Sequence, residues 1–276
     1  MTLKAAETSG AVALITPAFD DLLHGLMRYD LWGRLGWLEV KRRYRRTIIG
    51  PFWSAVSLAI FVAALGTVGA GLWKQEASLY LPFLAGGMVV WIMISSIINE
   101  ACSLFVGGQN LFRQMRFDYS ILALALVWRN FIVFLHNLSV YFLVSIVMAP
   151  QILKPTLIMA IPGLFFVLLN GVWIALLFGM FCLRFRDVQQ LVSSLIQIAM
   201  FITPIFWQPD NLSPDKRFIF ATLNPLYHLI DVVRAPLLGR MPALSTYVAV
   251  VIISVVGWVF TYFVFKRFRK RIAYWS

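Results

Sequence analysis

The sequence predicts an all-α, polytopic membrane protein. Of its 276 residues, 61% are hydrophobic and only 13% are charged, whereas a soluble domain is typically about half apolar and a quarter charged. The mean hydropathy is +0.81. Six apolar stretches are each long enough to cross a bilayer, which takes about 20 helical residues. No barrel-like alternation appears, so helix is the structure that satisfies the backbone in lipid.

The six predicted spans divide the chain into three parts. A cytoplasmic N-terminal segment covers 1–47, a transmembrane domain covers 48–265, and a basic cytoplasmic tail covers 266–276. The spans are residues 48–73, 80–105, 121–149, 156–183, 188–207 and 245–265.

Residues 20–46 have the pattern of an amphipathic interface helix. Five apolar residues recur there at helical spacing: Leu23, Met27, Leu31, Leu35 and Leu38. We expect this helix to lie in the headgroup layer with its apolar face toward lipid, although a soluble helix packed on a partner has the same pattern. Asp20 or Asp21 is placed to cap its start, and Gly33 and Gly36 weaken it locally, so that a break is expected there.

Lysine and arginine set the predicted orientation. With six spans both termini share a side, and seventeen of the 24 basic residues fall on that side. The positive-inside rule therefore places both termini in the cytoplasm. The densest basic cluster directly precedes the first span and holds its start at the inner face: Arg42, Arg43, Arg45 and Arg46.

The cytoplasmic connection after the second span, residues 107–120, is longer than a turn needs. Asn110 is suited to cap a short helix there that combines apolar and basic side chains. Such a gate or coupling helix is a natural docking element for a soluble partner, and an interfacial loop anchored by Phe112 and Phe117 is the alternative. The candidate docking residues are Asn110, Leu111, Phe112, Arg113, Met115 and Arg116.

The outer connection, residues 208–244, is semi-apolar and interrupted by prolines. Its segments 216–223 and 226–234 are too short to span, so they predict an external re-entrant helical hairpin that acts as a gate. Irregular backbone at membrane depth is tolerated only where protein covers it or where it lines a wet cavity. The candidate gate residues are Tyr227, His228, Asp231 and Arg234, and the last two are spaced to pair.

Charged and metal-binding patterns limit the chemistry of this chain. Glu100 and Arg129 lie inside predicted spans. Arg129 can extend to the interface, and a Glu100–Arg129 pair is the other expectation, since charges inside a membrane usually find partners. The sequence contains no Gly-Lys dipeptide and therefore no GxxxxGK[ST] phosphate loop. Its histidines and cysteines lack the spacing of metal ligands. We expect no catalytic residue, cofactor, metal or nucleic acid on this chain, and any ATP must bind another chain.

Five motifs follow one another along nearly the whole sequence: "RYRRTIIGPFW", "NLFRQMRFD", "RFRDV", "TPIFW" and "NPLYHLIDVVR". Together they resemble the membrane subunits (permeases) of type-two ABC exporters of polysaccharides, which include O-antigen, capsular polysaccharide and teichoic acid exporters. They are similar to that family's entry to the first span, its gate helix, its motif before the fifth span and its external hairpin. The stretch "FRQMRFDYS" departs from the family pattern because it lacks a Phe-Pro step and a later proline.

The resemblance implies a homodimer bound to two copies of a separate ATP-binding subunit, which would hold ATP and Mg. The complex would carry a polyprenyl-linked polysaccharide across the bacterial inner membrane, with the docking residues contacting the ATP-binding subunit. Some of the four clustered arginines would receive the lipid diphosphate, and the others would set topology and touch anionic lipid. Five aromatic residues would line the channel or belong to an ordinary interfacial belt: Phe52, Trp53, Phe201, Phe206 and Trp207.

Three other functions are alternatives to this one. A permease of the same type for a drug, a small lipid or teichoic acid would have the same fold. A membrane enzyme acting on polyprenyl-linked sugars needs catalytic carboxylates, but the chain has only 12 acidic residues, and the pair Asp20-Asp21 lies in the N-terminal segment. A purely structural bundle leaves the hairpin and the gate segment unexplained.

Overall fold

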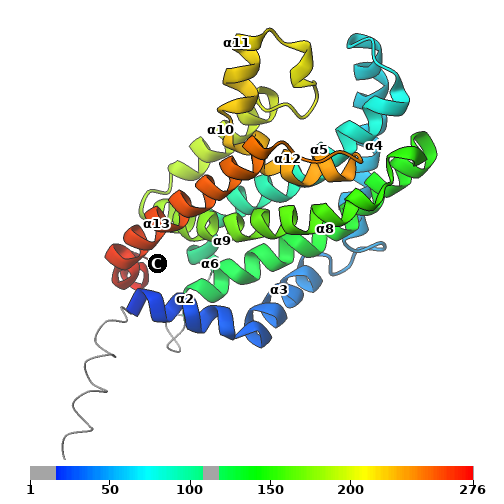
Figure 1. The fold of residues 1–276 in the computed structure, drawn as a ribbon. Helices are drawn as coiled ribbons and strands as arrows, with labels where there is room; N and C mark the ends of the chain where they lie inside the picture. The colour runs from blue at the N-terminus through cyan, green and yellow to red at the C-terminus, as the bar shows by residue number, and fades with distance from the viewer. Residues whose placement is uncertain (1–16, 108–117, 276) are drawn as a thin grey trace, which may run out of the picture.

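The computed structural model describes residues 17–107 and 118–275, and every regular element in those ranges is a helix (Figure 1). Five helical segments are long and apolar enough to cross a membrane. They are α4 (Phe52–Leu72), α5 (Ala77–Ala101), α8 (Ser120–Met148), η2 (Pro155–Met159) continued by α9 (Ala160–Arg184), and α13 (Leu244–Trp275). The chain is therefore the all-α, multi-pass membrane protein that its composition predicts.

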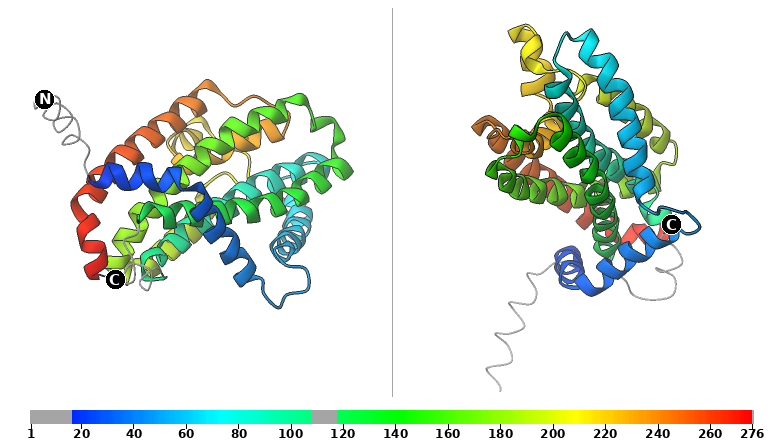
Figure 2. Two further views of the ribbon diagram at one scale, coloured as in Figure 1. Left: turned by 90° about the horizontal axis from the view of Figure 1, so that it is seen from below. Right: turned by 90° about the vertical axis from the view of Figure 1, so that its right-hand side faces the viewer.

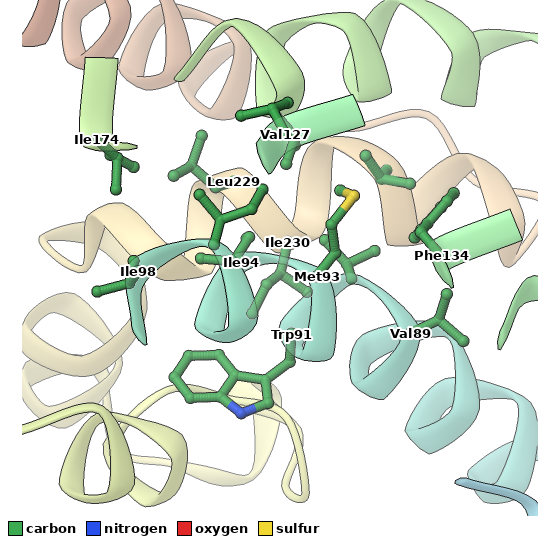
Figure 3. Packing of buried hydrophobic residues seen from close by; sticks show 14 of the residues in the cluster. Val89, Trp91, Met93, Ile94, Ile98, Val127, Phe134, Ile174, Leu229 and Ile230 are labelled. Atoms are coloured by element: carbon green, nitrogen blue, oxygen red, sulfur yellow. The ribbon is translucent and has the colours of Figure 1, made fainter. Parts of the chain in front are cut away.

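Helix α5 forms the centre of the bundle. It is apolar on all sides, as expected of a buried helix, and it packs against α4, α8, α9 and α12. In Figure 3, Ile94 of α5 lies beside Leu229 of α12, and Val127 of α8 and Ile174 of α9 belong to the same buried cluster. Helices α4 and α13 expose most of their length, which suits contact with lipid or with another subunit.

Both ends of the described chain lie at one end of the bundle. Helix α2 (Pro17–Met27) packs on α13, and α3 (Tyr29–Arg43) packs on α8 (Figures 1 and 2). We call this the terminal end. The opposite end, which we call the distal end, holds α11 (Pro214–Arg217).

Asp21 joins three helices at the terminal end. Its buried carboxylate accepts the backbone N–H groups of Tyr119 at 3.1 Å and Ser120 at 3.0 Å, which start α8. It also accepts Nε–H of Arg269, in α13, at 2.8 Å. Asp21 therefore caps α8 from a different helix, and the prediction that Asp20 or Asp21 caps its own helix was wrong because α2 already begins at Pro17.

The predicted amphipathic helix is divided into α2 and α3, and the division lies at Arg28 instead of at Gly33 or Gly36. Gly36 has a packing role: a Cβ at this position would lie 2.8 Å from the carbonyl oxygen of Ala125, so glycine allows α3 to approach α8 closely. Three residues of the predicted apolar stripe are exposed on the outside of the bundle: Leu23, Met27 and Leu38.

The last two predicted spans differ in length from the helices observed. Helix α10 (Val188–Ile202) ends before residue 207 because Pro204 keeps Thr203 extended, with φ −76° and ψ 137°. Its 15 residues extend about 22 Å, short of a hydrocarbon core of about 30 Å. Helix α13 instead continues through the predicted tail as far as Trp275.

The predicted re-entrant hairpin is present between α10 and α13. Helix α11 continues into the π-helical η4 (Phe218–Thr222), and α12 (Pro225–Leu237) returns into the bundle against α5, α9 and α13. Asn224 caps α12 by accepting the N–H of Leu226 at 3.0 Å. Three short elements complete the described part of the chain: α6 (Leu104–Gly107), η1 (Pro150–Ile152) and η3 (Pro209–Asn211).

Gly163 controls the approach of α9 to α12. A Cβ there would lie 2.4 Å from the carbonyl oxygen of Val232, so we expect Gly163→Ala to destabilise the fold by about 1–3 kcal/mol. The measurement is thermal unfolding of the purified protein in detergent. Gly71→Ala is the matched control, because a Cβ at Gly71 meets nothing within 4 Å. Equal melting temperatures for the two variants would contradict this packing.

Candidate functional site

Four charged side chains from three helices meet at the terminal end: Glu39, Arg43, Glu100 and Arg129. We call them the charge cluster. Arg129 of α8 donates to Glu39 of α3 and to Glu100 of α5, the second bond having an Nη2–Oε2 distance of 2.6 Å. Glu100 also accepts from Arg43 at 2.5 Å and from the amide of Asn130 at 2.8 Å. The predicted Glu100–Arg129 pair is confirmed, whereas the partnership of Glu39 was not predicted.

The four clustered arginines have different environments. Burial alone would lower the pKa of Arg43, but the charge and hydrogen bond of Glu100 outweigh it and raise that pKa above its ordinary value. Arg42, Arg45 and Arg46 are exposed, and none forms an ion pair within the described part of the chain. These three side chains are therefore accessible to an anionic group, and Arg43 is engaged by Glu100.

The six predicted docking residues, Asn110 to Arg116, lie outside the described residues. Their role in binding a partner stays a prediction. The described chain enters this connection through α6, whose Phe105 is fully buried beside Gly179 of α9. The connection therefore begins at a fixed point at the terminal end of the bundle.

Helix α10 carries exposed polar residues on one side. Gln190, Ser194 and Gln197 follow at helical spacing, Phe201 continues the same line, and all four are exposed. We call the first three the polar stripe. The hydroxyl of Ser194 donates to the carbonyl of Gln190 at 3.1 Å, whereas the two exposed amides are costly against hydrocarbon. The amides therefore favour water or another protein surface along this line, although the adjacent exposed residues, Leu191, Leu195 and Ile198, are apolar. The spacing was visible in the sequence, but the apolar average of the span concealed it.

The predicted channel aromatics fall into two groups. At the distal end of α10, the ring centroids of Phe201 and Phe206 are 5.8 Å apart, and Phe206 lies 6.2 Å from Phe61 of α4. Trp207 donates its indole N–H to the carbonyl of Phe201 at 3.1 Å. These rings place the end of α10 against α4. The other two predicted channel residues lie at the start of α4, about half exposed: Phe52 and Trp53.

The predicted gate residues lie on α12. Arg234 is only 1% exposed and pairs with Asp231 at 3.3 Å, as their spacing predicts. Tyr227 is half-buried, with its ring centroid 6.0 Å from the guanidinium carbon of Arg234. His228 is buried and bonds the carbonyl of Thr222 through Nε2 at 2.9 Å, so it joins α12 to η4.

The sequence of this chain matches that of a known transporter family. Residues 31–238 match the ABC-2 type transporter family, and the chain belongs to that family. The chain is thus a membrane transport subunit, and family membership implies a separate ATP-binding subunit as its partner.

Two relatives extend this comparison. The chain is similar to the O-antigen export system permease protein RfbA of Klebsiella pneumoniae, with 26% identity over 196 residues, covering 70% of this chain and 74% of that protein. It is also similar to the O-antigen export system permease protein RfbA of Myxococcus xanthus, with 22% identity over 225 residues, covering 79% and 84%.

Replacing Arg129 tests whether the charge cluster holds α3 to the bundle. Arg129→Gln leaves two largely buried carboxylates without their shared cation, so we expect a loss of about 3 kcal/mol in unfolding free energy. Thermal unfolding of the purified protein in detergent measures this loss of stability. Asp210→Asn is the control, because it breaks an exposed pair with Arg217, worth at most about 1 kcal/mol. An Arg129→Gln variant as stable as that control would refute a structural role for the cluster.

Proposed function

We propose that this chain is the transmembrane subunit of an ATP-driven exporter that moves a lipid-linked polysaccharide, of O-antigen or capsule type, across the bacterial inner membrane. Family membership supports the transporter class. The relatives' names, O-antigen export system permeases, support a glycan cargo. Two copies of this chain pair, and two copies of an ATP-binding subunit hydrolyse ATP with Mg.

The polar stripe of α10 is the observation that carries this proposal. A polysaccharide cannot cross hydrocarbon unassisted, because each unpaired polar group costs several kcal/mol. Gln190, Ser194 and Gln197 offer hydrogen-bonding groups along one line of α10, and Phe201 adds an aromatic ring at the end of the same line. A second copy of the chain facing this side would keep lipid away and complete a wet passage.

The terminal end supplies the features expected of the side from which the cargo is loaded. Both ends of the described chain and most of its described basic residues gather there, so the positive-inside rule favours a cytoplasmic location. Arg42, Arg45 and Arg46 remain exposed beside the start of α4. Arginine forks match phosphate oxygens, so in this proposal these three receive the diphosphate of the lipid carrier and touch anionic lipid.

The ATP-binding subunit would dock at the same end. Residues 110–116 follow α6 directly in the sequence, and α6 is fixed against α9. A push on this connection would therefore reach the transmembrane helices through packed contacts. The family relationship supports this partner, and the docking residues themselves remain those proposed from the sequence.

Gln197→Leu tests the passage along α10. Removing the amide leaves a dry, apolar section in the polar stripe, so we expect at least about a tenfold drop in polysaccharide export, equivalent to about 1.4 kcal/mol. The measurement is surface polysaccharide over time in cells whose own copy of the gene is deleted. Gln189→Leu is the matched control: it is exposed on the same helix but lies off the stripe, and it should export normally.

Two outcomes would contradict the proposed function. Normal export by Gln197→Leu, with the complex assembled, would remove α10 from the passage. Unchanged surface polysaccharide after gene deletion would point to another cargo, such as a drug or a small lipid, and loss of a bond-forming reaction instead would point to an enzyme.

A further inference from the structure

A cavity of about 410 Å³ opens at the distal end, between the start of α5, the loop that contains η3, and α12. We call it the distal cavity. Its volume lies within the range of about 300–1,000 Å³ typical of small-molecule sites. It lies away from the polar stripe, none of whose residues line it. The proposed passage therefore leaves this cavity without a role.

Arg234 forms the floor of the distal cavity. Its Nη1 donates to the carbonyl of Pro204 at 2.7 Å, and its guanidinium carbon lies 4.4 Å from the ring centroid of Phe83. Gly87 of α5 leaves room for it, because a Cβ there would lie 3.3 Å from Nη1. The side chain is thus fixed by packing and by hydrogen bonds, as a binding residue must be.

The polar groups of Arg234 and Asp231 are not fully used within the protein. Arg234 is 1% exposed, yet its Nε has no hydrogen-bond partner in the described part of the chain. Its only ion pair there is the long, 3.3 Å contact with Asp231, whose side chain is 11% exposed and lines the cavity. Leaving a buried charged group under-bonded costs free energy. Because Nε itself is buried, a ligand with hydroxyl groups would bond instead to the partly exposed carboxylate of Asp231.

The rest of the lining combines aromatic rings with planar polar groups. Tyr227 is half-buried and offers an aromatic ring, whose face attracts the weakly positive C–H groups of a ligand. The ring of Phe83 is 5% exposed and is covered by the guanidinium of Arg234. Gln208 and the Asp210–Arg217 pair, 2.9 Å apart, add donors and acceptors. Burial and the charge of Asp231 raise the pKa of Tyr227, so its hydroxyl stays protonated and able to donate.

These features fit a sugar ring better than other small ligands. A pyranose presents hydroxyl groups around its edge and C–H groups on its faces, matching carboxylates and arginines at the sides and an aromatic ring above or below. An acyl chain would cover polar and charged side chains of the lining without offering them hydrogen bonds. A metal ion is disfavoured because both acidic residues of the lining, Asp210 and Asp231, already pair with arginine.

Arg240 adds a preference among sugars. It lines the cavity and is exposed, and the described residues provide it with no ion-pair partner. The other charges of the lining are balanced, Arg217 by Asp210 and Arg234 by Asp231. The cavity therefore carries one positive charge in excess, which favours a sugar that bears a carboxylate.

We propose that the distal cavity is a saccharide-binding site that holds one or two sugar units, preferably of an acidic sugar, through Asp231, Arg234 and Tyr227, with Arg240 contacting the carboxylate. The inference deepens the proposed function and rests on it for the origin of the sugar: the site would hold the exported chain as it leaves the distal end. Sugar units bound there would hinder the polysaccharide from moving backward between cycles of ATP hydrolysis.

The test uses the full-length chain assembled with its ATP-binding subunit in lipid nanodiscs, titrated with methyl glucuronide and methyl glucoside and followed by saturation-transfer NMR. We expect both sugars to bind saturably, the glucuronide more tightly. Asp231→Asn should weaken both about tenfold, because it removes a charged acceptor. Arg240→Gln should abolish only the preference for the glucuronide. Lys216→Gln, an exposed neighbour outside the lining, should bind as the wild type does.

A second variant guards against misfolding. Because Asp231→Asn removes the counter-charge of a buried arginine, each variant's melting temperature is measured, and Tyr227→Phe, which leaves the ion pair intact, should also weaken both sugars. Unsaturable binding by the wild type, or wild-type affinity in both Asp231→Asn and Tyr227→Phe, would overturn the proposal. Loss of sugar binding in the variants while gene deletion leaves surface polysaccharide unchanged would overturn the proposed function and keep the site. If the wild type binds no sugar while gene deletion abolishes surface polysaccharide, the saccharide-binding site is overturned and the proposed function is kept.

Discussion

Arg129 holds the terminal end of the molecule together because it neutralises two carboxylates from two other helices. Glu39 comes from α3, which lies along the outside of the bundle, and Glu100 comes from α5 at its centre. In a poorly solvated site the attraction between opposite charges is strong, but a lone charge is very unfavourable. The position of α3 is therefore tied to that of α5 and α8. With α3 fixed, the exposed arginines that follow it have a defined place beside α4.

At the distal end a buried arginine is also stabilised, but by a different set of groups. Arg234 returns into the bundle on α12, where it meets Asp231, the carbonyl of Pro204 and the ring of Phe83. Helix α5 connects the two ends, with Gly87 making room for one arginine and Glu100 pairing with the other. The two charged junctions are thus linked by the buried helix α5 at the centre of the subunit. The elements around that centre, α4, α10 and α13, are the ones left largely exposed.

The sequence was most informative wherever a single segment determined the structure. The length and hydropathy of the long spans predicted their helices, and spacing predicted the pairing of Asp231 with Arg234. It failed at other contacts between distant segments, although it did anticipate the pairing of Glu100 with Arg129. Nothing near Asp21 indicates that it caps α8, about 100 residues away, and nothing near Glu39 indicates that it faces Arg129. The average apolarity of residues 188–207 likewise concealed both the early end of α10 and its polar stripe, since averaging discards position around the helix.

The exposed sides of α10 and α13 differ in a way that bears on assembly. Along the middle of α13 the exposed large side chains are aliphatic or aromatic, as in Val255, Val256 and Phe260. Such a surface can contact lipid without leaving polar groups unpaired. The exposed side of α10 includes Gln190 and Gln197, and α10 is too short to span a bilayer alone. Lipid would have to thin locally and tolerate unpaired amides to cover it. A second protein surface or water removes both costs, so the helix least suited to lipid is the one expected to face another subunit across an aqueous space.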